Sequence, residues 1–203
     1  RKLQMADIIY TYNNNVYFNI TNRCTCKCVF CIRDEKDTLG EAKEMWHDHN
    51  PSFEEIKAAV DAFDFAPYKE AVFCGYGEPT CSYDNLIATA KYMKEKNPHV
   101  TLRLNTNGLG ELYNKKPIVE ELAAYIDAVS ISLNAPNAAR YQEVTRPCYQ
   151  DAFKDMLAFA EKAKKAFKEV KFSVVSIISE QEIADSQKLA DEMGIPLRVR
   201  IYS

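Results

Sequence analysis

The sequence lacks any long apolar run. The first fifteen residues contain no stretch of the kind that forms a signal peptide, and no later stretch approaches the roughly 20 apolar residues of a membrane-spanning helix. We therefore expect no membrane partner, and we expect a soluble protein of the cytoplasm.

The sequence also lacks an excess of positive charge. Lys and Arg number 26 and Asp and Glu number 29, for a formal net charge of -3 and a pI near 5.7. Such a chain does not attract phosphate backbones over long range, so it carries no strong nucleic-acid signature. No repeat, low-complexity tract or linker divides the 203 residues, 47% of which are hydrophobic. Length and composition predict a single domain that spans residues 1–203.

Six short runs of apolar and β-branched residues have the length of strands, and helical segments lie between them. The predicted strands are 16–21, 70–75, 101–106, 128–133, 171–178 and 197–202. Ser52 with Glu55 and Ser179 with Glu182 match the capping box that begins a helix. The alternation of strands and helices predicts an α/β fold with a parallel sheet. Because six units are fewer than the eight of a closed barrel, we expect a partial, open (β/α)6 TIM-like barrel, with a doubly wound sheet as the alternative.

Four cysteines lie within eight residues directly after the first predicted strand. The segment TNRCTCKCVFCIRD contains Cys24, Cys26, Cys28 and Cys31, and the whole sequence contains seven cysteines. In a reducing compartment, such clustering favours a metal site over disulfides. Thiolates are the ligands of iron–sulfur clusters, and a cluster bound by only three cysteines leaves one iron open for a small molecule.

A zinc site is the alternative for these cysteines, because CxC and CxxC spacings also chelate zinc. A structural zinc site normally uses two ligand pairs separated by a longer loop. The sequence has no second close pair, since Cys74 and Cys81 lie apart and Cys148 is isolated. A non-catalytic module, with structural zinc or a redox-sensing cluster, is therefore the second hypothesis.

The segment CTCKCVFC resembles the Cys-x3-Cys-x-aromatic-Cys motif of radical S-adenosylmethionine enzymes. Phe30 occupies the aromatic position. The resemblance implies that Cys24, Cys28 and Cys31 are the catalytic cysteines and the metal ligands of a [4Fe–4S] cluster, whose open iron binds S-adenosylmethionine. It implies reductive cleavage of this cofactor to methionine and a 5′-deoxyadenosyl radical that abstracts hydrogen from a substrate. Cys26 is then a bystander, which we expect to face away from Cys24 and Cys28.

Later strand ends carry segments that resemble the cofactor contacts of this family. Gly75, Tyr76, Gly77 and Glu78 resemble its glycine–glycine–glutamate segment, although Tyr76 departs from the pattern. The resemblance implies that this segment holds the methionyl ammonium, with backbone carbonyls that glycine brings close and the carboxylate of Glu78. The other polar residues implied at the cofactor are Asn105, Asn107, Ser130, Ser132 and Asn134. Ordinary turn chemistry is the alternative explanation for the asparagines.

Three more residues are candidates for cofactor binding. Phe30 and Tyr202 are implied at the adenine. Arg146 follows the fourth predicted strand, where a guanidinium can grip a carboxylate with two hydrogen bonds. Arg198 and Arg200 alternate onto one face of the last strand and compete for that role. An exposed arginine or a structural ion pair is the alternative for each.

The resemblance implies an enzyme that receives electrons from a one-electron donor of the flavodoxin or ferredoxin type. We expect an unidentified substrate, either a protein, as for the activases of glycyl-radical enzymes, or a nucleobase, because a partial barrel leaves a side gap for a macromolecule. The segment NAPNAARYQEVTRP resembles the TatD-associated group within this superfamily.

Overall fold

The structure, a computed structural model, describes residues 5–202 and is built on a seven-stranded sheet. The strands are β1 (Ile9–Tyr12), β2 (Asn15–Phe18), β3 (Glu70–Phe73), β4 (Thr101–Thr106), β5 (Ala128–Ser132), β6 (Glu169–Val175) and β7 (Leu197–Arg200). They lie side by side in chain order, with β1 and β7 at the two edges. Strands β2 to β7 are parallel, and β1 pairs antiparallel with β2.

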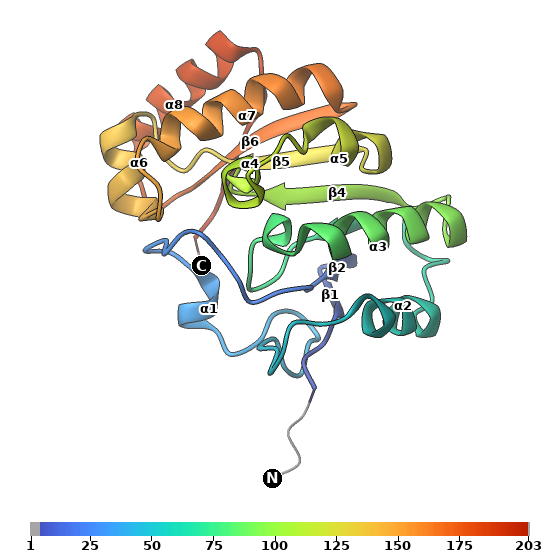
Figure 1. Ribbon diagram of the computed structural model, residues 1–203. Helices are drawn as coiled ribbons and strands as arrows, with labels where there is room; N and C mark the ends of the chain where they lie inside the picture. Colours follow the sequence, from blue (N-terminus) through green and yellow to red (C-terminus); the bar gives the residue numbers. More distant parts are fainter. Residues whose placement is uncertain (1–4, 203) are drawn as a thin grey trace.

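The helices cover one face of this sheet (Figure 1). They are α1 (Ile32–Glu35), α2 (Phe53–Ala62), the 3-10 helix η1 (Pro79–Ser82), α3 (Tyr83–Lys96), α4 (Gly110–Asn114), α5 (Val119–Tyr125), α6 (Ala138–Thr145), α7 (Ala152–Ala166) and α8 (Glu180–Met193). Right-handed crossovers between neighbours in strictly sequential order leave every covering helix on the same side. A doubly wound sheet would reverse its strand order, so that alternative is wrong and the partial, open barrel is confirmed.

Strand β1 was not predicted. Asn13 and Asn14 join β1 to β2, and both have positive φ, 48° and 62°. This is the backbone of a two-residue hairpin turn, for which asparagine is a favoured residue. The signal in the sequence was the asparagine pair between two short alternating runs. The hairpin adds an antiparallel strand to one edge of the six predicted ones.

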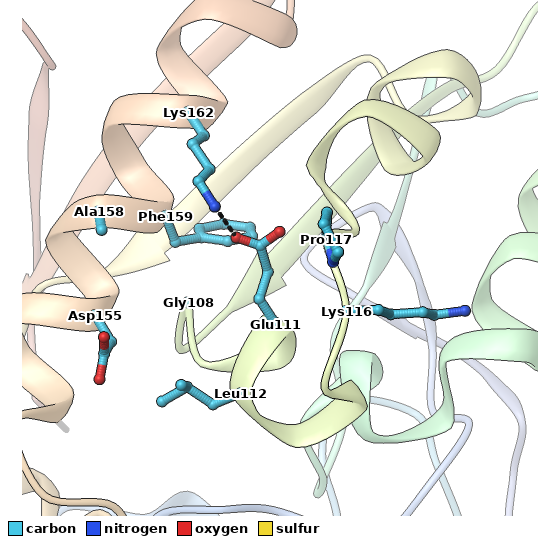
Figure 2. A pocket seen from close by; sticks show the side chains of 9 residues that line it. All are labelled: Gly108, Glu111, Leu112, Lys116, Pro117, Asp155, Ala158, Phe159 and Lys162. Carbon is cyan, nitrogen blue, oxygen red and sulfur yellow. Dashed lines mark hydrogen bonds and ion pairs between the residues drawn. The ribbon is translucent and has the colours of Figure 1, made fainter.

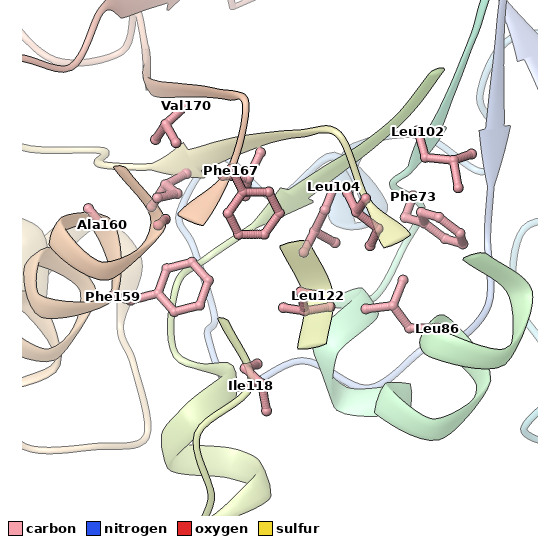
Figure 3. Close-up of a cluster of buried hydrophobic side chains, with 14 of the residues drawn as sticks. Phe73, Leu86, Leu102, Leu104, Ile118, Leu122, Phe159, Ala160, Phe167 and Val170 are labelled. Atoms are coloured by element: carbon pink, nitrogen blue, oxygen red, sulfur yellow. The ribbon is translucent and has the colours of Figure 1, made fainter. Parts of the chain in front are cut away.

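Alternation along each strand separates the two faces of the sheet. In β4, Leu102 and Leu104 are fully buried toward the helices, whereas Arg103 and Asn105 lie on the inner face. Figure 3 shows the core between the sheet and helices α3, α5 and α7, where Phe73, Leu104 and Phe159 are among the apolar side chains. The inner face is therefore left for polar side chains.

Helices α2 and α8 begin where the predicted capping residues, Ser52 and Ser179, lie. Ser179 and Glu182 form the complete capping box at α8. At α2, the Ser52 hydroxyl accepts from the Glu55 N–H, but the Glu55 carboxylate contacts His49 instead of closing the box. None of the described helices combines the length and apolar content needed for a membrane span. The domain limits of 1–203 stay a prediction.

Candidate active site

The cysteine loop leaves the carboxyl end of β2 and is held against the last turn of α6 and the chain that follows it. The Val29 N–H donates to the Val144 carbonyl at 2.9 Å, and the Cys148 N–H donates to the Thr25 carbonyl at 2.9 Å. Cys26 and Pro147 form an isolated antiparallel bridge. The loop is thus fixed by the fourth crossover of the barrel and lies at the carboxyl ends of the strands, the edge where ligands bind in α/β sheets.

The loop carries four thiols, those of Cys24, Cys26, Cys28 and Cys31, which we call the thiol row. Cys26 is buried and hydrogen-bonds with the thiols of Cys24 and Cys28, while Cys28 also acts electrostatically on Cys31. The expectation that Cys26 faces away from its neighbours is therefore wrong. Side chains two apart in an extended segment point to the same side, which brings residues 24, 26 and 28 together.

The pKa values of Cys24 and Cys26 depend on hydrogen bonding within the thiol row. The hydrogen bond from Cys26 is the main cause that lowers the pKa of Cys24. The hydrogen bonds to Cys24 and Cys28, followed by burial, raise the pKa of Cys26. Hydrogen bonding between Cys24 and Cys26 therefore shifts their two pKa values in opposite directions. A thiolate is the form that binds metal.

Among residues 5–202, no three His, Cys, Asp or Glu side chains converge closely enough to hold a metal ion. A zinc site needs its ligands around a single centre, with Zn–S distances of about 2.3 Å, whereas the cysteines of a [4Fe–4S] cluster bind different iron atoms and lie further apart. Thiol donors are the ligand type that an iron–sulfur cluster uses, so the residues of the loop fit such a cluster.

Glu78 joins two strand ends behind the cysteine loop. Its Oε1 accepts from the Thr106 hydroxyl at 2.6 Å and from the Thr80 hydroxyl at 2.7 Å. Its Oε2 accepts from the Asn107 N–H at 2.8 Å. Burial raises the pKa of Glu78, although these hydrogen bonds act in the opposite direction. The carboxylate thus stabilises the turns after β3 and β4, which leaves it fewer free lone pairs for a ligand.

Gly75 and Gly77 permit a close approach between the turn after β3 and the start of the cysteine loop. A Cβ atom on Gly77 would lie 2.2 Å from the Thr21 carbonyl oxygen, and one on Gly75 would lie 2.3 Å from the Asn19 Oδ1. Neither position admits a side chain. Both glycines are therefore required by the protein itself, independently of any cofactor.

Asn107 has a structural role and also reaches the cysteine loop. Its Oδ1 accepts from the Leu109 N–H at 3.0 Å, which is the turn chemistry proposed as the alternative. Its Nδ2 donates to the Thr25 hydroxyl at 3.0 Å and to the Cys26 sulfur at 3.5 Å. Asn107 thus connects the end of β4 to the thiol row.

Other predicted polar residues divide between two places. Asn105, Ser130 and Ser132 line a cavity on the inner face of the sheet. Asn134 follows β5 in a left-handed conformation and donates to the Thr145 hydroxyl at 3.3 Å. The Oδ1 atoms of Asn105 and Asn134 are buried without a hydrogen-bond partner in the described structure. Buried acceptors of this kind favour a bound ligand or water.

The remaining predicted contacts are more scattered. Phe30 is half-buried against the main core, and Tyr76 is buried in a smaller cluster with Tyr10. Arg146 ends α6 in a left-handed conformation and is exposed beside the cysteine loop. The Tyr202 hydroxyl contacts Glu35 of α1, so the end of the described chain lies next to the helix that follows Cys31 (Figure 1).

Tyr141 is a candidate that the sequence did not single out. It is 1% exposed, and its hydroxyl has no hydrogen-bond partner among the described residues. Burial raises the pKa of Tyr141, and the charges of Cys26 and Cys28 add to the effect, so the phenol lies near the thiol row. A tyrosine on a helix normally indicates core packing, and no local pattern distinguishes this one.

A second, smaller cavity lies outside the barrel between α4 and α7 (Figure 2). It has a volume of about 220 Å³, and the Lys162–Glu111 ion pair of 2.8 Å crosses it. None of the predicted site residues lines it. The candidate site therefore remains at the cysteine loop and the inner face of the sheet.

An open α/β barrel with a thiol-rich loop at the carboxyl ends of its strands is the core of a metal-cluster enzyme. Residues 18–190 match the model of the Radical SAM superfamily. The chain belongs to this superfamily. Radical SAM enzymes use a [4Fe–4S] cluster and S-adenosylmethionine, so both predicted cofactors are confirmed at the level of the family, and the non-catalytic alternative is not favoured.

Curated relatives of known activity share part of their length with this chain. A GTP 3',8-cyclase of Desulforamulus reducens is 27% identical over 204 residues, which cover 95% of this chain and 57% of the relative. The dual-specificity RNA methyltransferase RlmN of Pseudomonas entomophila is 32% identical over 127 residues, which cover 56% of this chain and 30% of the relative. The chain thus spans about half the length, or less, of these relatives.

Solved structures share the fold at lower identity. Streptococcus suis SuiB, bound to the precursor peptide SuiA, has a TM-score of 0.65 at 20% identity, over 91% of this chain and 38% of SuiB. The enzyme anSMEcpe with bound AdoMet has a TM-score of 0.63 at 19% identity, over 92% of this chain and 50% of anSMEcpe. Both support the assignment of the fold.

Proposed function

We propose that this chain is the catalytic core of a radical SAM enzyme in which Cys24, Cys28 and Cys31 hold the [4Fe–4S] cluster. The observation that carries the proposal is the position of the cysteine loop, which is hydrogen-bonded to the turn after β4 and to the chain after α6. When bound, the cluster and S-adenosylmethionine supply radical chemistry that begins with one-electron cleavage of a sulfur–carbon bond.

Around these cysteines, the residues of the chain have distinct tasks. The Gly75–Glu78 segment offers carbonyl oxygens and a buried carboxylate to the methionyl ammonium. Asn134 and Tyr141 have buried polar atoms without partners, which a bound cofactor would satisfy. Phe30 and Tyr202 are proposed to contact the adenine of the cofactor. Arg146 is proposed to bind a carboxylate of the cofactor or of the substrate.

The substrate is part of the proposal only as a class. The matched relatives are named for different substrates, since one is a GTP cyclase, one is an RNA methyltransferase and one was solved with a precursor peptide. We keep a protein or a nucleobase as the candidate substrates and a flavodoxin- or ferredoxin-type protein as the electron donor. A cytoplasmic location and membership of the TatD-associated group complete the proposal, and seven free cysteines suit a reducing compartment.

The test is anaerobic reconstitution with iron and sulfide. We expect about four iron atoms per chain, as one [4Fe–4S] cluster requires. After addition of a reductant and S-adenosylmethionine, we expect 5′-deoxyadenosine above the level formed by the reductant alone. The matched control is the variant in which Cys24, Cys28 and Cys31 are all alanine. Colourless protein with one stoichiometric zinc would instead support the structural metal module.

A further inference from the structure

The inner face of the sheet carries an open, polar cavity of about 360 Å³, and Arg198 and Arg200 of the edge strand β7 are exposed at its rim. All seven strands, together with Asn13 of the β1–β2 turn, contribute to its lining, which includes four basic side chains, Arg103, Lys171, Arg198 and Arg200. No residue of the cysteine loop or of the Gly75–Glu78 turn is among them. Asn105, Ser130 and Ser132, which are candidates for cofactor binding, are among them, so the cavity includes part of the predicted cofactor site and none of the thiol row.

Two of the four basic side chains in this cavity are neutralised by the protein. Arg103 contacts Glu70 at 3.3 Å and Glu169 at 3.1 Å. Lys171 contacts Glu169 at 3.0 Å. These cations and carboxylates form a network on β3, β4 and β6, so they have little charge left for a ligand.

The other two basic side chains have no such partner. Within residues 5–202, the guanidinium groups of Arg198 and Arg200 make no ion pair and no hydrogen bond. Both lie on β7, opposite Ser173 and Val175 of β6, and residues two apart in a strand share a face. Burial raises the pKa values of Tyr17 and Cys74, and the charges of Arg198 and Arg200, respectively, act in the opposite direction.

Hydrogen-bonding groups accompany these two charges. Ser132 and Ser173 are paired across β5 and β6 and both line the cavity, and Ser173 is paired in turn with Arg198 of β7. Asn105 lies further round the same wall, and its Oδ1 is buried without a partner. A cavity with two unpaired guanidinium groups, hydroxyl groups and a free acceptor matches a ligand that is anionic at one end and a hydrogen-bond donor elsewhere.

We propose that this cavity binds the substrate of the enzyme through an anionic group, a phosphate or a carboxylate, that Arg198 and Arg200 grip together. This inference rests on the proposed function, because it takes the ligand beside the cofactor residues to be the substrate. The planar guanidinium fork suits both anions, since each presents two oxygens to it. Arg103 and Lys171 are already paired with carboxylates, so the proposed anion subsite does not extend to them.

The test is calorimetric titration of the anaerobic, unreduced holoprotein with inorganic phosphate and, separately, with acetate, at constant ionic strength set with chloride. We expect one site per chain for at least one of the two anions, and the tighter anion identifies the group on the substrate. Arg198→Gln and Arg200→Gln should each weaken this binding about tenfold or more. Arg198→Lys should retain part of the affinity, because it keeps the charge and loses the fork.

The matched control is Arg140→Gln on α6, where Arg140 pairs with Glu143 and Glu182 outside the cavity and loses the same charge. It should bind the anion as the wild type does. Absence of binding, or equal binding by the Arg198→Gln, Arg200→Gln double variant, would overturn the inference. An equal loss of affinity for S-adenosylmethionine in the two variants would assign both arginines to the cofactor and also overturn it. The anion titration contains no reductant and does not depend on cleavage of S-adenosylmethionine. A failure of cleavage in the reconstitution experiment would therefore contradict the proposed function without affecting the result for the anion.

Discussion

The carboxylate of Glu78 accepts a hydrogen bond of 2.6 Å from the hydroxyl of Thr106, at the end of β4. This contact joins the turn that resembles the glycine–glycine–glutamate segment to the turn after β4. The two turns are therefore parts of one hydrogen-bonded unit at neighbouring strand ends, with Asn107 extending it to the cysteine loop.

Glu78→Gln should weaken binding of S-adenosylmethionine and leave the iron content unchanged, because it removes a counter-charge and no iron ligand. The structure adds a second effect. Threonine hydroxyls can rotate to accept from the new amide, but the Thr80 and Asn107 N–H groups cannot. We expect the free energy of unfolding to fall by about 1–3 kcal/mol. Thr106→Val is the control, since it loses the hydrogen bonds of the Thr106 hydroxyl with Glu78 and with the Gly108 N–H and retains the charge of Glu78. Equal cofactor affinity in wild type and Glu78→Gln would remove Glu78 from the site.

The raised pKa of Glu78 predicts a pH dependence of stability. Because burial makes the folded state bind this proton more tightly than the unfolded state, the contribution of Glu78 is fully present below its ordinary pKa of about 4.5. It is lost as the pH rises through the higher pKa of the folded protein. Denaturant unfolding of the cofactor-free protein should show this decline in the wild type relative to Glu78→Gln. Parallel curves for the two proteins would contradict it.

Cys26→Ala should retain iron and the production of 5′-deoxyadenosine, whereas Cys24→Ala, Cys28→Ala and Cys31→Ala should each lose both. The contact of Cys26 with Cys24 and Cys28 makes this a stringent comparison, because all three thiols are neighbours. If Cys26→Ala loses iron as the others do, Cys26 is a ligand and the open iron is not assigned correctly. Iron analysis and product chromatography measure the two properties.

Tyr141→Phe should change stability and ligand affinity in opposite directions. Removing a buried hydroxyl that has no partner should raise the free energy of unfolding of the cofactor-free protein by about 1 kcal/mol. If the hydroxyl serves the cofactor, affinity for S-adenosylmethionine should fall about tenfold. Tyr83→Phe is the control, because the Tyr83 hydroxyl already contacts Glu121 and its loss should destabilise the protein. A destabilised Tyr141→Phe would show that the hydroxyl has a protein partner.

Gly77→Ala should displace the start of the cysteine loop. The added Cβ would lie 2.2 Å from the Thr21 carbonyl oxygen and 2.7 Å from that of Arg23, which directly precedes Cys24. We expect a loss of about 1–3 kcal/mol of stability together with reduced iron content. Gly40→Ala is the matched control, since its Cβ would lie 2.0 Å from the Thr11 carbonyl, away from the cysteines. It should lose stability and keep its iron. Equal iron content in both variants would contradict the role assigned to Gly77.

The presence of the six parallel strands was predictable because each strand depends on a local pattern, whereas their sequential order in the sheet came from the structure. Strand β4 agrees with its predicted range at both ends, and β5 ends one residue earlier than predicted. Strand β3 ends at Phe73 instead of residue 75, because Gly75 begins the turn that packs on Asn19. Runs of apolar residues do not show where such a turn begins.

The sequence by itself determined the class of this protein, because three cysteines at fixed spacing and a Gly-Glu-Pro turn are local features of the chain. Only the tertiary structure decided which side chains lie together. It joined Glu78 to Thr106, brought Cys26 between its neighbours and left Tyr141 without a partner. It also left the charges of Arg198 and Arg200 unpaired in the cavity. Each of these relationships depends on how neighbouring segments pack in three dimensions, and a hydrogen bond or ion pair between such segments has no period or spacing that a single sequence can reveal.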